Sequence, residues 1–225
     1  MDQSIKKKRA RGRLSREMIE DAAFEVIERE GLSGFSMRKL AAALGCEAMS
    51  IYHHFPSAAH LHEALVDRLI GALEIPDASL PWRQRMRIAI EDFRRIGRDH
   101  PAYSSFIVTY RMNSPTCLVW LNGIIGLFKD GGFGTELSAR LFRTVGYYLM
   151  GAVLDENAGY SRGPSAVNTV SDEQLARDYP NVMAAGRFFG AAEFDKTFEL
   201  GLDMVLDEME RLRDGANASQ PSGKV

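Results

Sequence analysis

Cysteine is scarce in this sequence: the chain of 225 residues contains two, Cys46 and Cys117. Two cysteines give no disulfide framework, which excludes the small disulfide-stapled folds of secreted proteins. The charged beginning of the chain lacks the apolar run of a secretory leader. The most apolar stretch, CLVWLNGIIGLF, is too short and too interrupted to span a bilayer. We therefore expect a cytoplasmic, reduced protein with no membrane segment.

The alternation of apolar and polar residues that marks a half-buried strand is also absent over any useful length. Apolar residues instead recur at the three- and four-residue spacing of amphipathic helices, so the predicted fold is all-α. A loop is expected over residues 161–174, and a frayed tail after Arg213. The expected helices span residues 16–30, 37–44, 48–54, 57–73, 82–98, 102–111, 115–130, 135–159, 181–190 and 193–213.

Catalytic and metal-binding patterns are weak. Residues 159–163, GYSRG, match the G-x-S-x-G elbow of hydrolases, but a predicted helix precedes them and no histidine follows His100. Four histidines lie between His53 and His62, near Cys46, and a zinc site there is the alternative to a surface role. Adjacent helical histidines point about 100° apart, which disfavours that site. We expect no enzyme activity, no metal and no cofactor.

Positive charge is concentrated at one end of the chain. The first sixteen residues hold seven basic side chains against Asp2, a net charge of +6, whereas the whole chain carries −2. A basic arm on an otherwise acidic protein indicates a polyanionic partner at that end.

Two short predicted helices follow a longer one around a glycine turn, which is the pattern of a helix-turn-helix unit. Ser36 is a suitable N-cap for the first of the two, and Gly45 ends it. In the next helix Ile51 and Phe55 share the core side, so Met49 and His53 face outward, where they suit the edges of bases in a major groove. The candidate DNA-binding residues are Lys7, Lys8, Arg9, Arg11, Ser36, Arg38, Glu47, Met49, Ser50, Tyr52, His53 and His54.

The stretch FSMRKLAAALGCEAMSIYHHFPS resembles the DNA-binding signature of the TetR (tetracycline-repressor) family of bacterial regulators. The resemblance implies a homodimer and an all-helical C-terminal domain that binds a small molecule and relaxes DNA binding. The segments PWRQRMR, RDHP and YYLMGAVLDE resemble the family branch that includes the tetracycline repressor itself, in which a histidine near His100 takes part in binding a metal–drug complex. Two positions depart from the pattern: Ala58 stands where the family usually has lysine, and Glu47 where it often has Ser or Thr.

These observations predict a ligand-responsive transcriptional regulator, most simply a repressor that a small, largely apolar effector releases from a palindromic double-stranded DNA operator. The alternative is a DNA-binding regulator that has no small-molecule effector and is controlled by a protein partner. The expected domains are a basic arm over 1–14, a helix-turn-helix domain over 15–62, a ligand-binding and dimerisation domain over 63–213, and a flexible tail over 214–225.

Two further sets of residues are predicted for the C-terminal domain. The effector site is expected to use side chains that share apolar helix stripes, and these are Phe106, Tyr110, Trp120, Ile124, Phe128, Tyr147 and Met150. The dimer surface is expected on the apolar stripes of helices 135–159 and 193–213, which would form a four-helix bundle across a two-fold axis. Those stripes are Leu141, Phe142, Val145, Leu149 and Val153, and Phe194, Phe198, Leu202, Val205, Leu206 and Met209.

Overall fold

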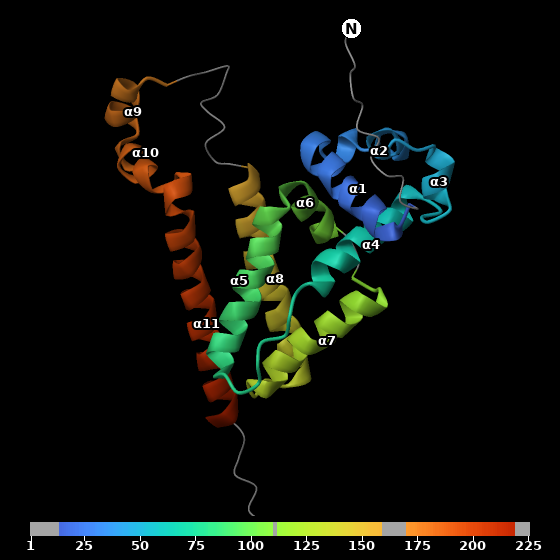
Figure 1. Ribbon diagram of the computed structural model, residues 1–225. Coiled ribbons are helices and arrows are strands. Elements are labelled where there is room, and N and C mark those ends of the chain that lie inside the picture. Colours follow the sequence, from blue (N-terminus) through green and yellow to red (C-terminus); the bar gives the residue numbers. More distant parts are fainter. Residues whose placement is uncertain (1–13, 110–111, 159–169, 219–225) are drawn as a thin grey trace, which may run out of the picture. The chain divides into compact units, whose positions relative to one another are not determined.

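The computed structural model describes residues 14–109, 112–158 and 170–218 (Figure 1). These residues form helices and no strand, as predicted. No helix in these ranges is long and apolar enough to cross a membrane. The chain divides into two compact units, Met1–Leu69 and Ile70–Val225. Helix α4 (Ala58–Gly71) runs through this division, and the boundary predicted between residues 62 and 63 falls inside it.

The first unit contains α1 (Arg16–Glu30), a 3-10 turn (Leu32–Gly34), α2 (Met37–Leu44), α3 (Ala48–Tyr52) and most of α4. Each helix contributes apolar side chains at helical spacing to one core. The side chains without exposed surface include Ile19, Ile27, Leu40, Ile51, Phe55, Leu61 and Leu65. The short α2 and α3 therefore depend on packing for their stability rather than on helix propensity.

The second unit is a bundle in which α5 (Trp82–Asp99) and α7 (Pro115–Asp130) pack against α8 (Thr135–Ala158) (Figure 1). Helix α9 begins inside the predicted loop because Ser171 caps it, accepting a hydrogen bond from the backbone N–H of Gln174 at 3.2 Å. Helix α11 continues past the predicted end at Arg213 to Ala218. The bounds are α5 (Trp82–Asp99), α6 (Pro101–Thr109), α7 (Pro115–Asp130), α8 (Thr135–Ala158), α9 (Asp172–Asp178), α10 (Pro180–Ala185) and α11 (Phe194–Ala218), with 3-10 turns at Gly186–Phe188 and Ala191–Glu193.

Most of the stripe residues predicted for the dimer surface lie in the core of the second unit, so their assignment to that surface is wrong; Phe142, Phe194 and Val205 are partly exposed. The pairing of the two helices across a two-fold axis stays a prediction. Leu202 and Leu206 on α11 and Val153 on α8 have no exposed surface. The helical period located each stripe correctly, but each helix uses its stripe to pack within its own unit. The apolar side chains that α11 leaves most exposed are different ones, Leu200 and Met204, each 64% exposed.

Close backbone approach holds α8 and α11 together. A Cβ atom on Gly201 would lie 2.7 Å from the ring of Tyr148, so only glycine fits at this position without a shift. The Tyr148 hydroxyl donates a hydrogen bond to the carbonyl of Phe198, and the two rings stack with centroids 5.4 Å apart. Burial raises the pKa of Tyr148 to about 12, so the hydroxyl stays a donor at physiological pH.

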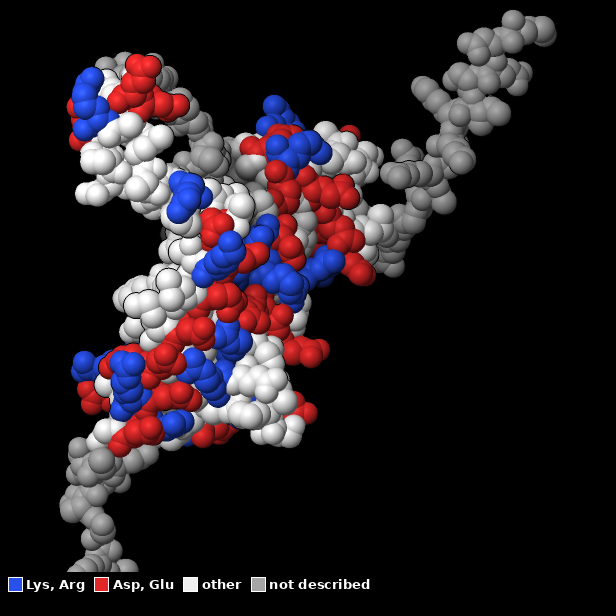
Figure 2. Space-filling model, turned by 90° about the vertical axis from the view of Figure 1, so that its left-hand side faces the viewer, with Lys and Arg blue, Asp and Glu red and all other residues white. Residues whose placement is uncertain are grey.

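Ion pairs connect α5 to α11 along their length. Arg83 lies 2.7 Å from Asp207, Arg87 pairs with Glu199 and Asp203, and Arg98 lies 2.8 Å from Asp195. Figure 2 shows basic and acidic side chains interspersed over this side of the molecule. Partly exposed pairs contribute little stability, so their main effect is to fix the register of the two helices.

One ion pair in the second unit is buried. The Arg94 guanidinium donates to the Glu156 carboxylate at 2.7 and 3.1 Å, and the two side chains are 9% and 8% exposed. Arg94 also lies 2.9 Å from Asp195 and over the ring of Phe198. The pair therefore fixes α5 to α8 beside the start of α11.

We predict that Glu156→Gln lowers the free energy of unfolding by about 3 kcal/mol, because the buried guanidinium of Arg94 loses its main counter-charge. The matched control is Glu136→Gln, which removes a surface pair with Arg140 on the same helix. The control should cost less than about 0.5 kcal/mol. Urea unfolding of both variants measures the difference, and equal effects would show that the buried pair does not stabilise the fold.

Candidate nucleic-acid interface and ligand cavity

Capping and turn residues place α2 and α3 as the sequence predicts. The Ser36 side chain accepts from the backbone N–H of Lys39 at 3.2 Å, and Gly45 takes the left-handed conformation with φ 65° and ψ 34°. Glu47 occupies the N-cap position of α3, and in the described part of the chain its side chain makes no capping hydrogen bond. Glu47 is exposed to solvent, and its predicted contact with a base stays a prediction.

The face that α3 turns away from the core is the predicted one. Ile51 and Phe55 are completely buried, whereas Met49 is 65% exposed. Tyr52 and His53 are also exposed, and Ser50 and His54 are partly exposed. The predicted rotation of the helix is confirmed, and this face presents a hydroxyl, imidazoles and a thioether to solvent. The contacts of these groups with bases stay a prediction.

Arg16 contacts the two residues His54 and Phe55 that follow α3. Its guanidinium donates to the carbonyl of His54 at 2.7 Å and lies 4.1 Å from the centroid of the Phe55 ring. Sequence reasoning counted Arg16 with the basic arm, but the structure makes it a positioning residue for α3. The sequence does not show whether a basic residue at the start of a helix belongs to a DNA-contacting arm or holds another helix of the same unit in place.

Of the remaining predicted DNA-binding residues, Ser36 and Arg38 are described by the structure and four are not. Arg38 lies exposed on α2, and the exposed Ser36 uses its hydroxyl as the helix cap. Tyr110 of the predicted effector site and four residues of the arm lie outside the described residues. Those four are Lys7, Lys8, Arg9 and Arg11.

The histidines of the first unit have separate surroundings. His60 Nδ1 lies 2.8 Å from the Ser57 hydroxyl, and the His62 ring meets Phe35 edge-on with centroids 5.3 Å apart. Burial lowers the pKa of His62, which favours a neutral ring. Among the described residues there is no group of three or more His, Cys, Asp or Glu side chains that could hold a metal ion.

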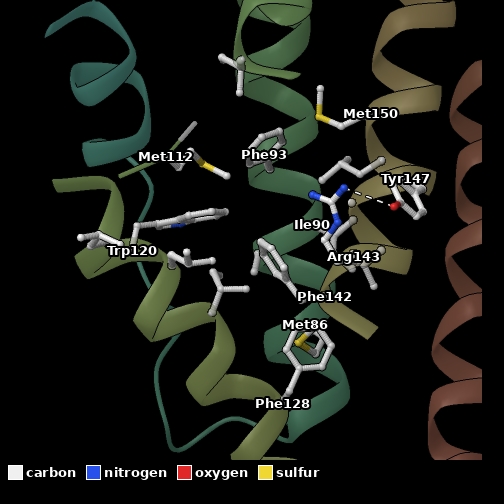
Figure 3. Close-up of a pocket in the computed structure, with 18 of the residues that line it drawn as sticks. Met86, Ile90, Phe93, Met112, Trp120, Phe128, Phe142, Arg143, Tyr147 and Met150 are labelled. Atoms are coloured by element: carbon white, nitrogen blue, oxygen red, sulfur yellow. Dashed lines mark hydrogen bonds between the residues drawn. The ribbon is translucent and has the colours of Figure 1, made fainter. Parts of the chain in front are cut away.

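The second unit contains a partly open cavity of about 570 Å³ (Figure 3). Trp120, Ile124 and Phe128 line it from α7, and Tyr147 and Met150 line it from α8. These are five of the predicted effector residues, brought together on one cavity. Phe106 does not line it and instead packs edge-on to Tyr103, with centroids 6.0 Å apart.

Sequence reasoning missed the third wall, which α5 provides. Met86, Ile90 and Phe93 line the cavity, and the Phe93 ring packs against that of Trp120 with centroids 5.7 Å apart. The signal was present, because these residues form one apolar stripe on an otherwise highly charged helix. The stripe shows that a face is covered, but it does not distinguish a cavity wall from solid packing.

The polar part of the cavity differs from that of a metal–drug site. Asn113 and Arg143 are its polar and charged lining residues outside the aromatic side chains, and no carboxylate or imidazole lines it within the described residues. His100 ends α5 and is not part of the lining, while Glu156 is engaged with Arg94. Divalent metals such as Mg²⁺ are held mainly by oxygen ligands, carboxylates above all, so these walls do not fit a bound metal chelate.

Family models match both parts of the chain. The model described as bacterial regulatory proteins, tetR family, matches residues 19–65, and the one described as tetracyclin repressor-like, C-terminal domain, matches residues 75–213. The class D tetracycline repressor protein of Escherichia coli is 34% identical over 213 residues, which cover 88% of this chain and 90% of that protein.

Solved structures share the fold. The Streptomyces coelicolor TetR family protein ActR, in complex with actinorhodin, is similar with a TM-score of 0.73 and 21% identity over 90% of this chain and 99% of that chain. A TetR variant from Acinetobacter baumannii in complex with minocycline is similar with a TM-score of 0.66 and 22% identity, over 89% of this chain and 98% of that chain.

The exposed face of α3 gives a test of base recognition against phosphate contact. His53→Ala and Met49→Ala should change preference at individual base pairs by about 1–3 kcal/mol. Tyr52→Phe should weaken binding to all DNA sequences alike, because a phosphate contact carries no base information. Selection from a random duplex library measures the preferences, with thermal unfolding as the folding control. A changed preference with Tyr52→Phe and none with His53→Ala would show that the face is wrongly assigned.

Proposed function

Because the chain belongs to the TetR family of bacterial regulators, we propose that this DNA-binding transcriptional regulator is a repressor that a small, largely apolar effector releases from a palindromic operator. Members of the family are transcription factors rather than enzymes, which agrees with the absence of a catalytic pattern in the sequence.

The observation that carries the effector is the cavity. A volume of about 570 Å³ is that of a drug-sized ligand site, and apolar walls with few polar groups are typical of such sites. Two of the similar proteins were solved in complex with small molecules, one with actinorhodin and the other with minocycline. The cavity favours a small-molecule effector over control by a protein partner, because a purely protein-controlled regulator has no need of such an apolar cavity.

Helix α7 supplies a physical route from the effector to the end of α4. Within the second unit, a Cβ atom on Gly71 at the end of α4 would lie 3.1 Å from Thr116 of α7. A Cβ on Gly123 would lie 2.6 Å from Ile75, which follows α4 in the connector. The same helix carries Trp120 and Ile124 of the cavity wall. A ligand that displaces α7 therefore displaces the end of α4.

Release requires that the effector bind one arrangement of α4 better than the other. A ligand with equal affinity for both states would shift nothing, however tightly it bound. A coupling free energy of about 1–3 kcal/mol is typical of such regulators and lowers DNA affinity roughly 5- to 150-fold.

Two copies of the chain are expected to bind one operator. A single recognition helix reads few base pairs, and two-fold symmetry places the two copies on successive major-groove faces. The surface that supports pairing is the exposed apolar side of α8 and α11 rather than the stripes predicted first. Leu200 and Met204 on α11 are each 64% exposed, and Leu154 on α8 is 36% exposed. Nothing lies within 4 Å of a Cβ built on Gly151, which leaves room for close approach there.

Filling the cavity tests the proposed function. We predict that Ile124→Trp abolishes release by any compound that frees wild-type protein from its operator, while DNA binding itself is kept. The matched control is Val119→Trp on the same helix, because Val119 is 74% exposed and does not line the cavity. Mobility-shift titration of a panel of planar aromatic compounds measures release. A compound that releases all three proteins equally would show that the cavity is not the effector site.

The dimer surface is tested by charge. Met204→Glu should give a monomer of unchanged thermal stability that has lost operator affinity, because it places a carboxylate on an exposed pairing surface. Leu202→Glu should instead unfold the second unit, because that side chain is completely buried. Sedimentation at micromolar concentration and circular dichroism distinguish the two results. A Met204→Glu dimer with full operator affinity would contradict this surface.

A further inference from the structure

The charge in the cavity lies on one wall, and the other walls are apolar. Among the described residues that line it, Arg143 alone is charged, and it comes from α8. Figure 3 shows Arg143 beside Tyr147 on the α8 side, with Trp120 on the α7 side opposite and Phe93 and Ile90 of α5 between them. The walls on α5 and α7 are thus apolar, and the positive charge lies at one side.

Arg143 differs in its partners from the other arginines of α5 and α8. Arg83, Arg94 and the nearby Arg140 each lie within ion-pair distance of a carboxylate. Arg143 forms no ion pair with any carboxylate that the structure describes. Its described contacts are a long hydrogen bond to the Tyr147 hydroxyl at 3.3 Å and the face of the same ring, 5.0 Å from the guanidinium carbon to the centroid. Most of its five N–H donors are left for water or a ligand.

The burial of the lining residues shows which end of the cavity is closed. Phe128 and Met86 are 0% and 1% exposed, whereas Tyr147 is 68% exposed and Arg143 is also exposed. Leu118 of α7 also lines the cavity and is 50% exposed, but its side chain offers no polar group. A ligand whose inner end packs against Phe128 and Met86 can therefore place a polar outer end beside the guanidinium. A ligand without an acceptor group at this end would take water from Arg143 without replacing its hydrogen bonds, which costs binding energy. An anionic acceptor forms a stronger, charge-assisted hydrogen bond than a neutral one.

We propose that the effector is an anionic aromatic molecule, whose carboxylate, sulfonate or ionised phenol is bound by Arg143 and whose ring system packs on Phe93 and Trp120. This inference rests on the proposed function, since it names the chemical class of the molecule that fills the same cavity. A guanidinium is suited to bidentate binding of a planar anion. A cationic ligand is disfavoured, because no described lining residue carries a negative charge.

A pair of fluorescent dyes tests the inference on the intact protein. N-phenyl-1-naphthylamine is neutral, and 1-anilinonaphthalene-8-sulfonate is the same molecule with one sulfonate added. Both become fluorescent in apolar sites. We expect Arg143→Gln to weaken binding of the sulfonate dye about tenfold, through loss of a charge-assisted hydrogen bond, and to change binding of the neutral dye less than about twofold. Arg140→Gln is the matched control, because Arg140 lies exposed on the same helix outside the cavity and should change neither dye.

The other outcomes overturn the inference in distinguishable ways. If Arg143→Gln changes both dyes alike or neither, Arg143 does not recognise an anion. If it weakens both dyes and also dissociates the dimer in sedimentation, Arg143 belongs to the subunit interface. If neither dye binds, or if both bind Ile124→Trp as well as wild type, the cavity is not a ligand site, and the proposed function fails together with this inference.

Discussion

An apolar cavity of about 570 Å³ is the feature that constrains the rest of the second unit. Protein interiors are close-packed, and side chains that border empty space lose dispersion contacts that packed ones keep. The walls therefore need support from behind. This support comes from the buried Arg94–Glu156 pair and from the close contact of Gly201 with Tyr148, which meet at the ring of Phe198. A ligand that fills the cavity removes this cost, so an effector that binds there would also stabilise the fold by mass action.

Helix α7 is constrained on two of its faces. One face lines the cavity, and the other is held against the end of α4 and the connector through glycine contacts. A helix that is packed on two faces responds to a ligand by moving as a rigid body, because its side chains have little room to change rotamer. Under the proposed function, displacement of α7 by a ligand needs no special pathway of residues to reach the segment after α4, because a Cβ atom on Gly123 would already lie 2.6 Å from Ile75.

Helix caps, turns and buried helix faces were predictable from the sequence. Which neighbouring helix covers a given apolar face was not. The cap at Ser36, the left-handed Gly45 and the inward face of α3 follow from short-range chemistry, and the structure has them all. The apolar stripes of α8 and α11 were located correctly but assigned to the wrong surface, since periodicity does not tell packing within a subunit from packing between subunits. Arg143 was missed because a lone arginine on a helix looks like any solvated charge.

Three methionines, Met86, Met112 and Met150, line the cavity. An unbranched thioether chain adopts many shapes at similar energy, so such walls adapt to rings of different outline. A cavity with such walls can accommodate related compounds that differ in the shape of their ring edges. The range of compounds sensed can then widen or narrow by rotamer changes and single substitutions, while the helices that carry the signal keep their places.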